Sequence, residues 1–190
     1  DAGCRGTMGR RMKEQAMKET NQDLTFTMRG ERYALEVGYI REVLAVPKVT
    51  YIPQMPEYMS GVINVRGAAV PLLDLGHKFG IGKIDITAAT AIIIVEMPAD
   101  SPEEECSRFG VYVDTVEKVI SIAPEQIDPP PKIGSRINTS LIKGVGHIED
   151  NFVVILDITA ILSEADLVKI EGAALTESSE AVAPVTPEGA

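Results

Sequence analysis

The same β pattern occurs twice in this chain, and the repeat limits what the chain can fold into. The matching segments are 33–44 with 109–120, at an offset of 76 residues, and 61–62 with 144–145 and 71–75 with 154–158, both at an offset of 83. In each half, a strand that contains an aromatic residue is followed by an I/V-x-x-V motif. A strand that starts with glycine comes next, and then a strand that ends in the sequence L-D-L or L-D-I. This self-similarity predicts two copies of one small β unit.

Units of about 65–75 residues, the length set by the repeat, bury only about 60% of their chain surface and are marginally stable alone. We therefore expect the two units to pack on each other. A groove between them, lined by equivalent positions of both copies, is the hypothesis that follows. The alternative is a single open sandwich in which the similarity is accidental β patterning.

Apolar and polar residues alternate with a period of two over most of the chain, which indicates half-buried β-strands. The strands predicted in this way are 24–28, 33–37, 61–65, 69–75, 90–97, 109–114, 142–148 and 152–158. Ala91–Val95 is nearly all β-branched, as in a strand buried on both faces. Helical patterns are rare: residues 56–60 are expected to form a turn or two, and 159–168 is the best helix candidate.

The two ends of the chain differ from its central part. Residues 1–22 are polar, with glycines interrupting several basic side chains, and are interpreted as a flexible lead-in or tag remnant. Residues 169–190 bury too little apolar surface to offset chain entropy and are expected to be a disordered acidic tail. The domain between them, 23–168, is expected to contain two interleaved subdomains, about 23–88 and 89–158, followed by the helix.

The net charge of −10 excludes some classes of partner. A surface of this sign repels phosphate backbones and anionic headgroups, which argues against nucleic acid and membrane surfaces. The longest strongly apolar run, Ala88–Val95, is shorter than the roughly 20 residues that a membrane-spanning helix needs. The two cysteines, Cys4 and Cys106, make no disulfide framework and are expected to be reduced thiols.

Candidate catalytic and metal-binding residues are few. His77 and His147 have no second His or Cys at ligand spacing, and no Gly-x-Ser-x-Gly motif marks a nucleophile. Asp74 and Asp157 could work as general acid and base. Because they are repeat equivalents, we expect them instead to be the same turn residue in two different barrels. The sequence therefore predicts no enzyme, no cofactor and no metal, with a hydrolase based on these two aspartates as the alternative.

Two sets of residues are candidates for binding a partner. Arg66 lies in Asn64-Val-Arg-Gly67, between a β run and a glycine turn, and its guanidinium suits a bidentate contact with a carboxylate. The second set occupies the repeated I/V-x-x-V positions. These residues are core or, where the barrels leave a groove, its aliphatic lining for an amphipathic helix. The four positions are Ile40, Val43, Val116 and Val119.

These residues give the chain a resemblance to the CheW family of bacterial chemotaxis coupling proteins over residues 22–168. The most specific match is PEYMSGVINVRG at 56–67 followed by VPLLDL at 70–75. Further matching elements are YALEV at 33–37, IREV at 40–43, FGVYVD at 109–114 and ILD at 155–157. The resemblance implies an all-β fold of two SH3-like five-stranded barrels packed together, with a C-terminal helix.

The resemblance also implies a non-catalytic cytoplasmic scaffold that couples the histidine kinase CheA to methyl-accepting chemoreceptors, at the inner face of the membrane through receptor arrays. The receptor's cytoplasmic tip is expected in the groove between the barrels, and the regulatory domain of CheA on other barrel edges. The implied groove residues are Ile40, Glu42, Val43, Ala91, Ile92, Val116 and Val119, and the implied coupling residues are Arg66 and Asn64. A CheW-like module of a CheV-type protein and a small-molecule sensor that binds in the same groove are the alternatives.

Overall fold

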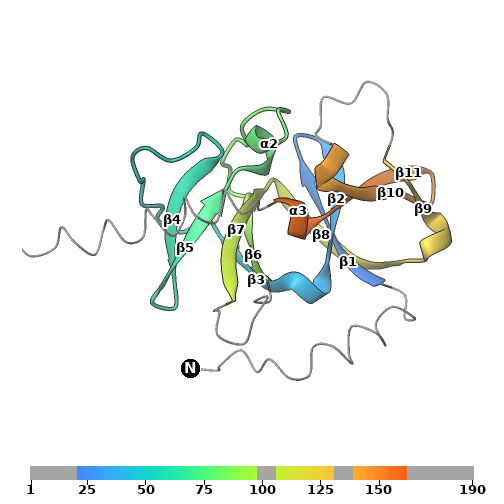
Figure 1. Cartoon of the computed structure of the whole chain (residues 1–190), viewed down its shortest axis with the longest axis horizontal. Coiled ribbons are helices and arrows are strands. Elements are labelled where there is room, and N and C mark those ends of the chain that lie inside the picture. The colour runs from blue at the N-terminus through green and yellow to red at the C-terminus, as the bar shows by residue number, and fades with distance from the viewer. Residues whose placement is uncertain (1–20, 98–105, 131–138, 162–190) are drawn as a thin grey trace, which may run out of the picture.

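The computed structural model describes residues 21–97, 106–130 and 139–161, and in this part of the chain the strands form two sheets. Sheet A has the spatial order β8 (Thr115–Ile122), β1 (Asn21–Met28), β2 (Glu31–Glu36), β11 (Asn151–Leu156), β10 (Ile142–Ile148) and β9 (Ile127–Asp128). Sheet B has the order β3 (Ile40–Ala45), β6 (Ala91–Met97), β7 (Ser107–Val113), β5 (Ala68–Leu73) and β4 (Met59–Val65). Figure 1 shows the sheets side by side, with β4 and β5 at one end of the molecule and β9, β10 and β11 at the other.

Short helices connect the strands. They are η1 (Val37–Tyr39), α2 (Leu75–Lys78), η2 (Pro124–Gln126), η3 (Thr139–Leu141) and α3 (Ile158–Ile161). Within the described ranges, no helix has the length and apolar character needed to cross a membrane. The eight predicted strands are confirmed, with ends that differ by three residues at most. The sequence pattern does not predict β3 and β8, because these edge strands are half-exposed and carry charged residues among the apolar ones.

The two sheets repeat one strand order, which confirms the predicted duplication. By sequence offset and by pairing, β3, β6, β7, β5 and β4 correspond to β8, β1, β2, β11 and β10. The central parallel pairing is equivalent as well, since Leu72 lies opposite Gly110 in sheet B and Ile155 lies opposite Ala34 in sheet A. Each sheet takes strands from both of the expected ranges, 23–88 and 89–158, so a cut between residues 88 and 89 does not separate the sheets.

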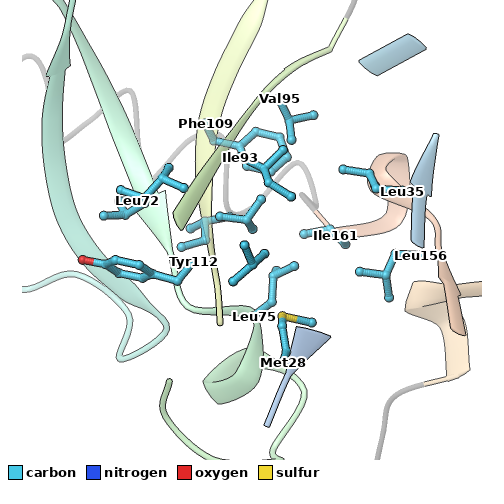
Figure 2. Packing of buried hydrophobic residues seen from close by; sticks show 14 of the residues in the cluster. Met28, Leu35, Leu72, Leu75, Ile93, Val95, Phe109, Tyr112, Leu156 and Ile161 are labelled. Atoms are coloured by element: carbon cyan, nitrogen blue, oxygen red, sulfur yellow. The ribbon is translucent and has the colours of Figure 1, made fainter. Parts of the chain in front are cut away.

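One hydrophobic core joins the two sheets, as the small size of each unit predicts. Fully buried side chains of sheet A, among them Phe26 and Leu35, belong to the same cluster as Ile93 and Phe109 of sheet B. Figure 2 shows side chains from both sheets pointing into this shared core, together with Ile161 of α3. In β6, the run from Ile92 to Val95 is at most 1% exposed, which confirms the strand predicted to be buried on both faces.

Several local expectations need correction or lie outside the described residues. Residues 56–60 form one turn, closed by a hydrogen bond of 2.8 Å from Met59 N–H to Pro56 O, because the chain enters β4 at Met59. Cys106 is disulfide-bonded, so the expectation of a reduced thiol at this position is wrong. Residues 21 and 22 belong to β1. The rest of the lead-in 1–20, the end of the helix 162–168 and the tail 169–190 are outside the described ranges.

Candidate functional site

Arg66 stands at the tip of the β4–β5 hairpin. Val65 pairs with Ala68, so the loop consists of Arg66 and Gly67, with φ angles of 54° and 87°. Two positive φ angles in a two-residue loop define a type I′ turn, whose twist matches that of the flanking strands. Asn64 stabilises the turn, because its Oδ1 accepts a hydrogen bond of 2.9 Å from Gly67 N–H. The turn therefore fixes the direction in which Arg66 leaves the sheet, and Asn64 supports that turn.

An ion pair joins Arg66 to Glu42 on β3. Arg66 Nη2 lies 3.2 Å from Glu42 Oε2. In sheet B, β3 is one edge, whereas β4 and β5 lie at the other edge. The pair therefore requires the sheet to curl until its two edges approach each other, as in a barrel. Curvature thus brings together two predicted site residues that are 24 positions apart in the sequence.

The predicted apolar groove positions occupy the edge strands of both sheets. Val43 on β3 and Val119 on β8 are repeat equivalents, and their exposed fractions are 43% and 51%. Ile40 and Val116, which are also equivalents, are half-buried and pack against the shared core. At its edge, each sheet therefore has an exposed valine close to a half-buried aliphatic residue on the same strand.

The two predicted groove residues on β6 are less accessible. Ala91 is half-buried and lies opposite Ala45 of β3. Ile92 has an exposed fraction of 0% and lies opposite Leu44. A partner on the surface therefore does not reach Ile92, whose side chain supports β3 from within the core.

A pocket of about 550 Å³ lies beside the Arg66–Glu42 pair. Its charged lining residues are Arg41, Glu42, Arg66 and Arg108, with Val65, Val70 and Ile94 among the apolar ones. Arg41 and Arg108 share Glu96 of β6, with Arg41 Nη1 at 3.4 Å and Arg108 Nε at 2.5 Å from Glu96 Oε2. Arg41, Glu96 and Arg108 were not predicted from the sequence, where nothing indicates that β3, β6 and β7 are neighbours.

Asp74 and Asp157 begin equivalent helices in the two halves of the fold. Asp74 follows β5 and caps α2, accepting hydrogen bonds of 3.0 Å from the backbone N–H groups of His77 and Ile84. Asp157 follows β11 and accepts a hydrogen bond of 3.0 Å from Thr159 N–H at the start of α3. Both carboxylates act as N-caps, in connections that follow different sheets, which confirms the expected shared turn role. Among the described residues, no group of three or more His, Cys, Asp or Glu side chains is placed to hold a metal ion.

Asp23 is a buried carboxylate in β1, opposite Ile120, which follows the predicted groove residue Val119 on β8. It is 3% exposed and lies opposite Glu36 of β2. Burial raises its pKa from the ordinary value of 3.8 to about 6, because desolvation disfavours the charged form and Glu36 adds like-charge repulsion. Lys143, which pairs with Glu36 at 3.6 Å, partly offsets both effects. Asp23 therefore lowers the stability of the folded state at neutral pH.

We expect Asp23→Asn to raise the free energy of unfolding at about pH 7.5 by up to about 3 kcal/mol, since one pKa unit corresponds to about 1.4 kcal/mol. Ionised Asp23 destabilises the folded state, and the substitution removes this destabilisation. The effect is present in full above pH 6, shrinks as the pH falls through the folded-state pKa, and is absent below pH 3.8. Urea denaturation at about pH 7.5 and about pH 4.5 measures both values. An equal gain at the two pH values would contradict this explanation.

Comparison with known proteins places these features in a family. A model of the CheW-like domain matches residues 22–166. The chemotaxis protein CheW of Klebsiella aerogenes is 28% identical over 151 residues, which cover 80% of this chain and 87% of that protein. The crystal structure of the scaffolding protein TtCheW from Thermoanaerobacter tengcongensis is similar with a TM-score of 0.68 and 30% identity, over 78% of this chain and 91% of that chain. This similarity confirms the all-β fold of two SH3-like barrels.

A CheV protein is also similar, but only in part. The chemotaxis protein CheV3 of Helicobacter pylori is 26% identical over 137 residues, which cover 71% of this chain and 42% of CheV3. The CheW protein and the TtCheW structure are instead matched over most of their length. The CheW-like model spans most of the sequence, from residue 22 to residue 166, and therefore this chain belongs to the CheW family.

Proposed function

We propose that this chain is a chemotaxis scaffold that couples the histidine kinase CheA to methyl-accepting chemoreceptors. Its family supports this role, and so do the names of its relatives, a chemotaxis protein and a scaffolding protein. The proposal places the chain in the cytoplasm, at the inner face of the membrane through its receptor partners. It assigns no catalytic step, because Asp74 and Asp157 hold backbone amides as helix caps.

The observation that carries the proposal is the pair of exposed, repeat-equivalent valines, Val43 and Val119. Single exposed apolar residues are common on soluble proteins. Here, however, each exposed valine lies on a sheet edge next to a half-buried aliphatic residue, Ile40 or Val116, and the arrangement occurs in both sheets. Such a surface suits the apolar face of an amphipathic helix. In this proposal it receives the helical cytoplasmic tip of the receptor.

A second surface completes the scaffold. The proposal assigns the regulatory domain of CheA to other edges of the barrels, so that receptor and kinase bind at the same time. Two modest affinities then reinforce each other, because the second binding event takes place at a high effective concentration. Glu42 and Arg66, which form an ion pair, would orient a partner through their charges.

A bridging experiment tests this function. A chemoreceptor cytoplasmic fragment is immobilised, CheA is added with or without this chain, and the retained CheA is quantified. We expect this chain to increase the retained CheA severalfold and to be retained itself. Equal retention of CheA in both samples, or failure of the chain to bind either protein, would show that the proposed function is wrong.

We expect Arg66→Ala to weaken binding of the receptor fragment or of CheA about fivefold, the effect of losing a partly exposed charged contact. Arg66 is 83% exposed at its side chain, so the fold should be unaffected by circular dichroism. The matched control is Arg29→Ala, because Arg29 also begins a two-residue Arg-Gly turn, with a φ of 53°. Isothermal titration calorimetry with each partner gives the affinities. Wild-type affinity of the Arg66 variant for both partners would remove Arg66 from the site.

A further inference from the structure

Three arginines line the 550 Å³ pocket beside the β4–β5 hairpin. Arg41 comes from β3, Arg66 from the hairpin tip and Arg108 from β7. Glu42 is the acidic residue of the lining, so three positive charges and one negative charge give the lining a net charge of +2. The whole chain carries a net charge of −10. The pocket is therefore a cationic site on an acidic protein, and its potential attracts an acidic occupant.

The arginines have donors to offer such an occupant. Glu96, which lies outside the lining, holds two of them in place, with its Oε2 at 2.5 Å from Arg108 Nε and 3.4 Å from Arg41 Nη1. Arg66 contacts Glu42 through Nη2. A guanidinium has five N–H donors in a fork that fits a carboxylate, and each of these contacts uses one nitrogen. Because the three arginine side chains are 40% to 83% exposed, they can bind a further carboxylate from the solvent side.

The chain itself carries an acidic segment that suits this pocket. Residues 171–180, with the sequence EGAALTESSE, contain Glu171, Glu177 and Glu180 and no lysine, arginine or histidine. The segment therefore has a charge of −3 at neutral pH, opposite in sign to the lining of the pocket. We call it the acidic segment.

The acidic segment is close enough to reach the pocket. It follows Ile161, whose carbonyl oxygen accepts a hydrogen bond from Lys78 Nζ, so α3 ends beside α2. The strand before α2 is β5, whose six residues separate α2 from the hairpin tip by about 20 Å. From Ile161 to Glu180 the chain spans about 28 Å even at the helical rise of about 1.5 Å per residue, and more when extended. The connection is therefore long enough in either conformation.

We propose that the acidic segment binds in the arginine pocket of its own chain, with its glutamate carboxylates on Arg41, Arg66 and Arg108. Opposite charge supports this occupant, and so does covalent attachment, because a tethered segment is present at a roughly millimolar effective concentration. The bound segment covers Arg66, which the proposed function assigns to a partner. It then acts as an intramolecular competitor that lowers the affinity for that partner. This consequence rests on the proposed function, whereas the contact itself does not.

Nuclear magnetic resonance of the full chain tests the contact. The neutralised variant carries Glu171→Gln, Glu177→Gln and Glu180→Gln, which remove the charge of the acidic segment without shortening the chain. We expect the backbone amide signals of Gly67 and Arg108 to differ between the wild type and the neutralised variant. Raising the salt concentration from about 0.05 M to about 0.5 M should move the wild-type signals to the positions seen in the variant, because salt screens the contact.

A synthetic peptide of residues 171–180, added to the full chain, gives the affinity. We expect it to shift the Gly67 amide of the neutralised variant, and to bind the wild type at least about fivefold more weakly, because the tethered segment already occupies the pocket. Adding Arg108→Gln to the neutralised variant should weaken peptide binding about fivefold. The matched control is Arg32→Gln, since Arg32 is the repeat equivalent of Arg108 and pairs with Glu117 at 2.7 Å on sheet A. It should leave peptide binding unchanged.

The possible outcomes separate this inference from the proposed function. Identical pocket signals in the wild type and the neutralised variant would overturn the contact. A difference that grows with protein concentration would overturn it as well, because the occupant would then belong to a second copy. In calorimetry with the chemoreceptor fragment and with CheA, the neutralised variant should bind the partner of Arg66 about threefold more tightly than the wild type.

The consequence for the partner has its own contradicting result. Equal partner affinity of the wild type and the neutralised variant, alongside the expected shift at Gly67, would show that the segment binds the pocket without competing for Arg66. If the wild type binds neither the receptor fragment nor CheA, the proposed function is wrong, and the contact of the acidic segment is still decided by the amide signals.

Discussion

Replacing Gly61 with alanine is expected to lower the free energy of unfolding by about 3 kcal/mol or more, because two separate costs add at this position. Gly61 has a φ of 139°, a conformation that residues with a Cβ rarely adopt. An alanine Cβ would also lie 2.3 Å from the carbonyl oxygen of Thr50, which is paired with Val62 in a short bridge. That oxygen belongs to the backbone and cannot rotate away, so the bridge itself would have to open.

A matched control separates the two costs. Gly67 also has a positive φ, 87°, but a Cβ added there meets nothing within 4 Å. Gly67→Ala should therefore cost only about 1 kcal/mol, the conformational part alone. Urea denaturation of both variants gives the two values. Equal destabilisation would mean that the close approach of Thr50 contributes nothing and that the pairing of this loop with β4 is not rigid.

Val119→Asp is expected to weaken binding of a chemoreceptor fragment about thirtyfold or more, the largest functional effect proposed for this chain. The change places a charge where the receptor helix would cover an apolar side chain, and desolvating an unpaired carboxylate costs about 2 kcal/mol or more. Val119 is 51% exposed at the edge of sheet A, so the free protein should tolerate the substitution with little loss of stability. Calorimetry and a thermal melt measure the two quantities.

The control for this variant is Tyr51→Asp. Tyr51 is 74% exposed and follows Thr50, which pairs with β4 at the edge of sheet B opposite to β3. An aspartate there adds the same charge to an exposed apolar position outside the predicted groove, and receptor affinity should be unchanged. If both variants weaken binding equally, the loss reflects added negative charge rather than the groove. If neither does, β8 is not part of the receptor surface.

The candidate site was predictable only in part. The family resemblance singled out Glu42 and Arg66, and the structure brings them within 3.2 Å of each other. Repeat offsets singled out Val43 and Val119, which are exposed. Ile92 carries the same kind of side chain as its neighbours, so the sequence could not show that it is fully buried. Nothing in the sequence indicated that Arg41 and Arg108 both pair with Glu96, because isolated charged residues in strands normally face solvent.

The sequence by itself determined that the chain contains two copies of one β unit. It also determined that the apolar residues follow the period of a strand rather than that of a helix. Residue alternation depends on neighbours along one strand, so 33–37 and 109–114 were recognisable without any knowledge of their partners. Only the tertiary structure decided that β1 and β2 join the sheet of β8–β11, and that β3 lies beside β6. Both the pairing of segments that are distant in the sequence and the curvature of the sheets depend on packing around a shared core. The grouping of charges from β3, β6, β7 and the hairpin therefore exists only once that core has formed.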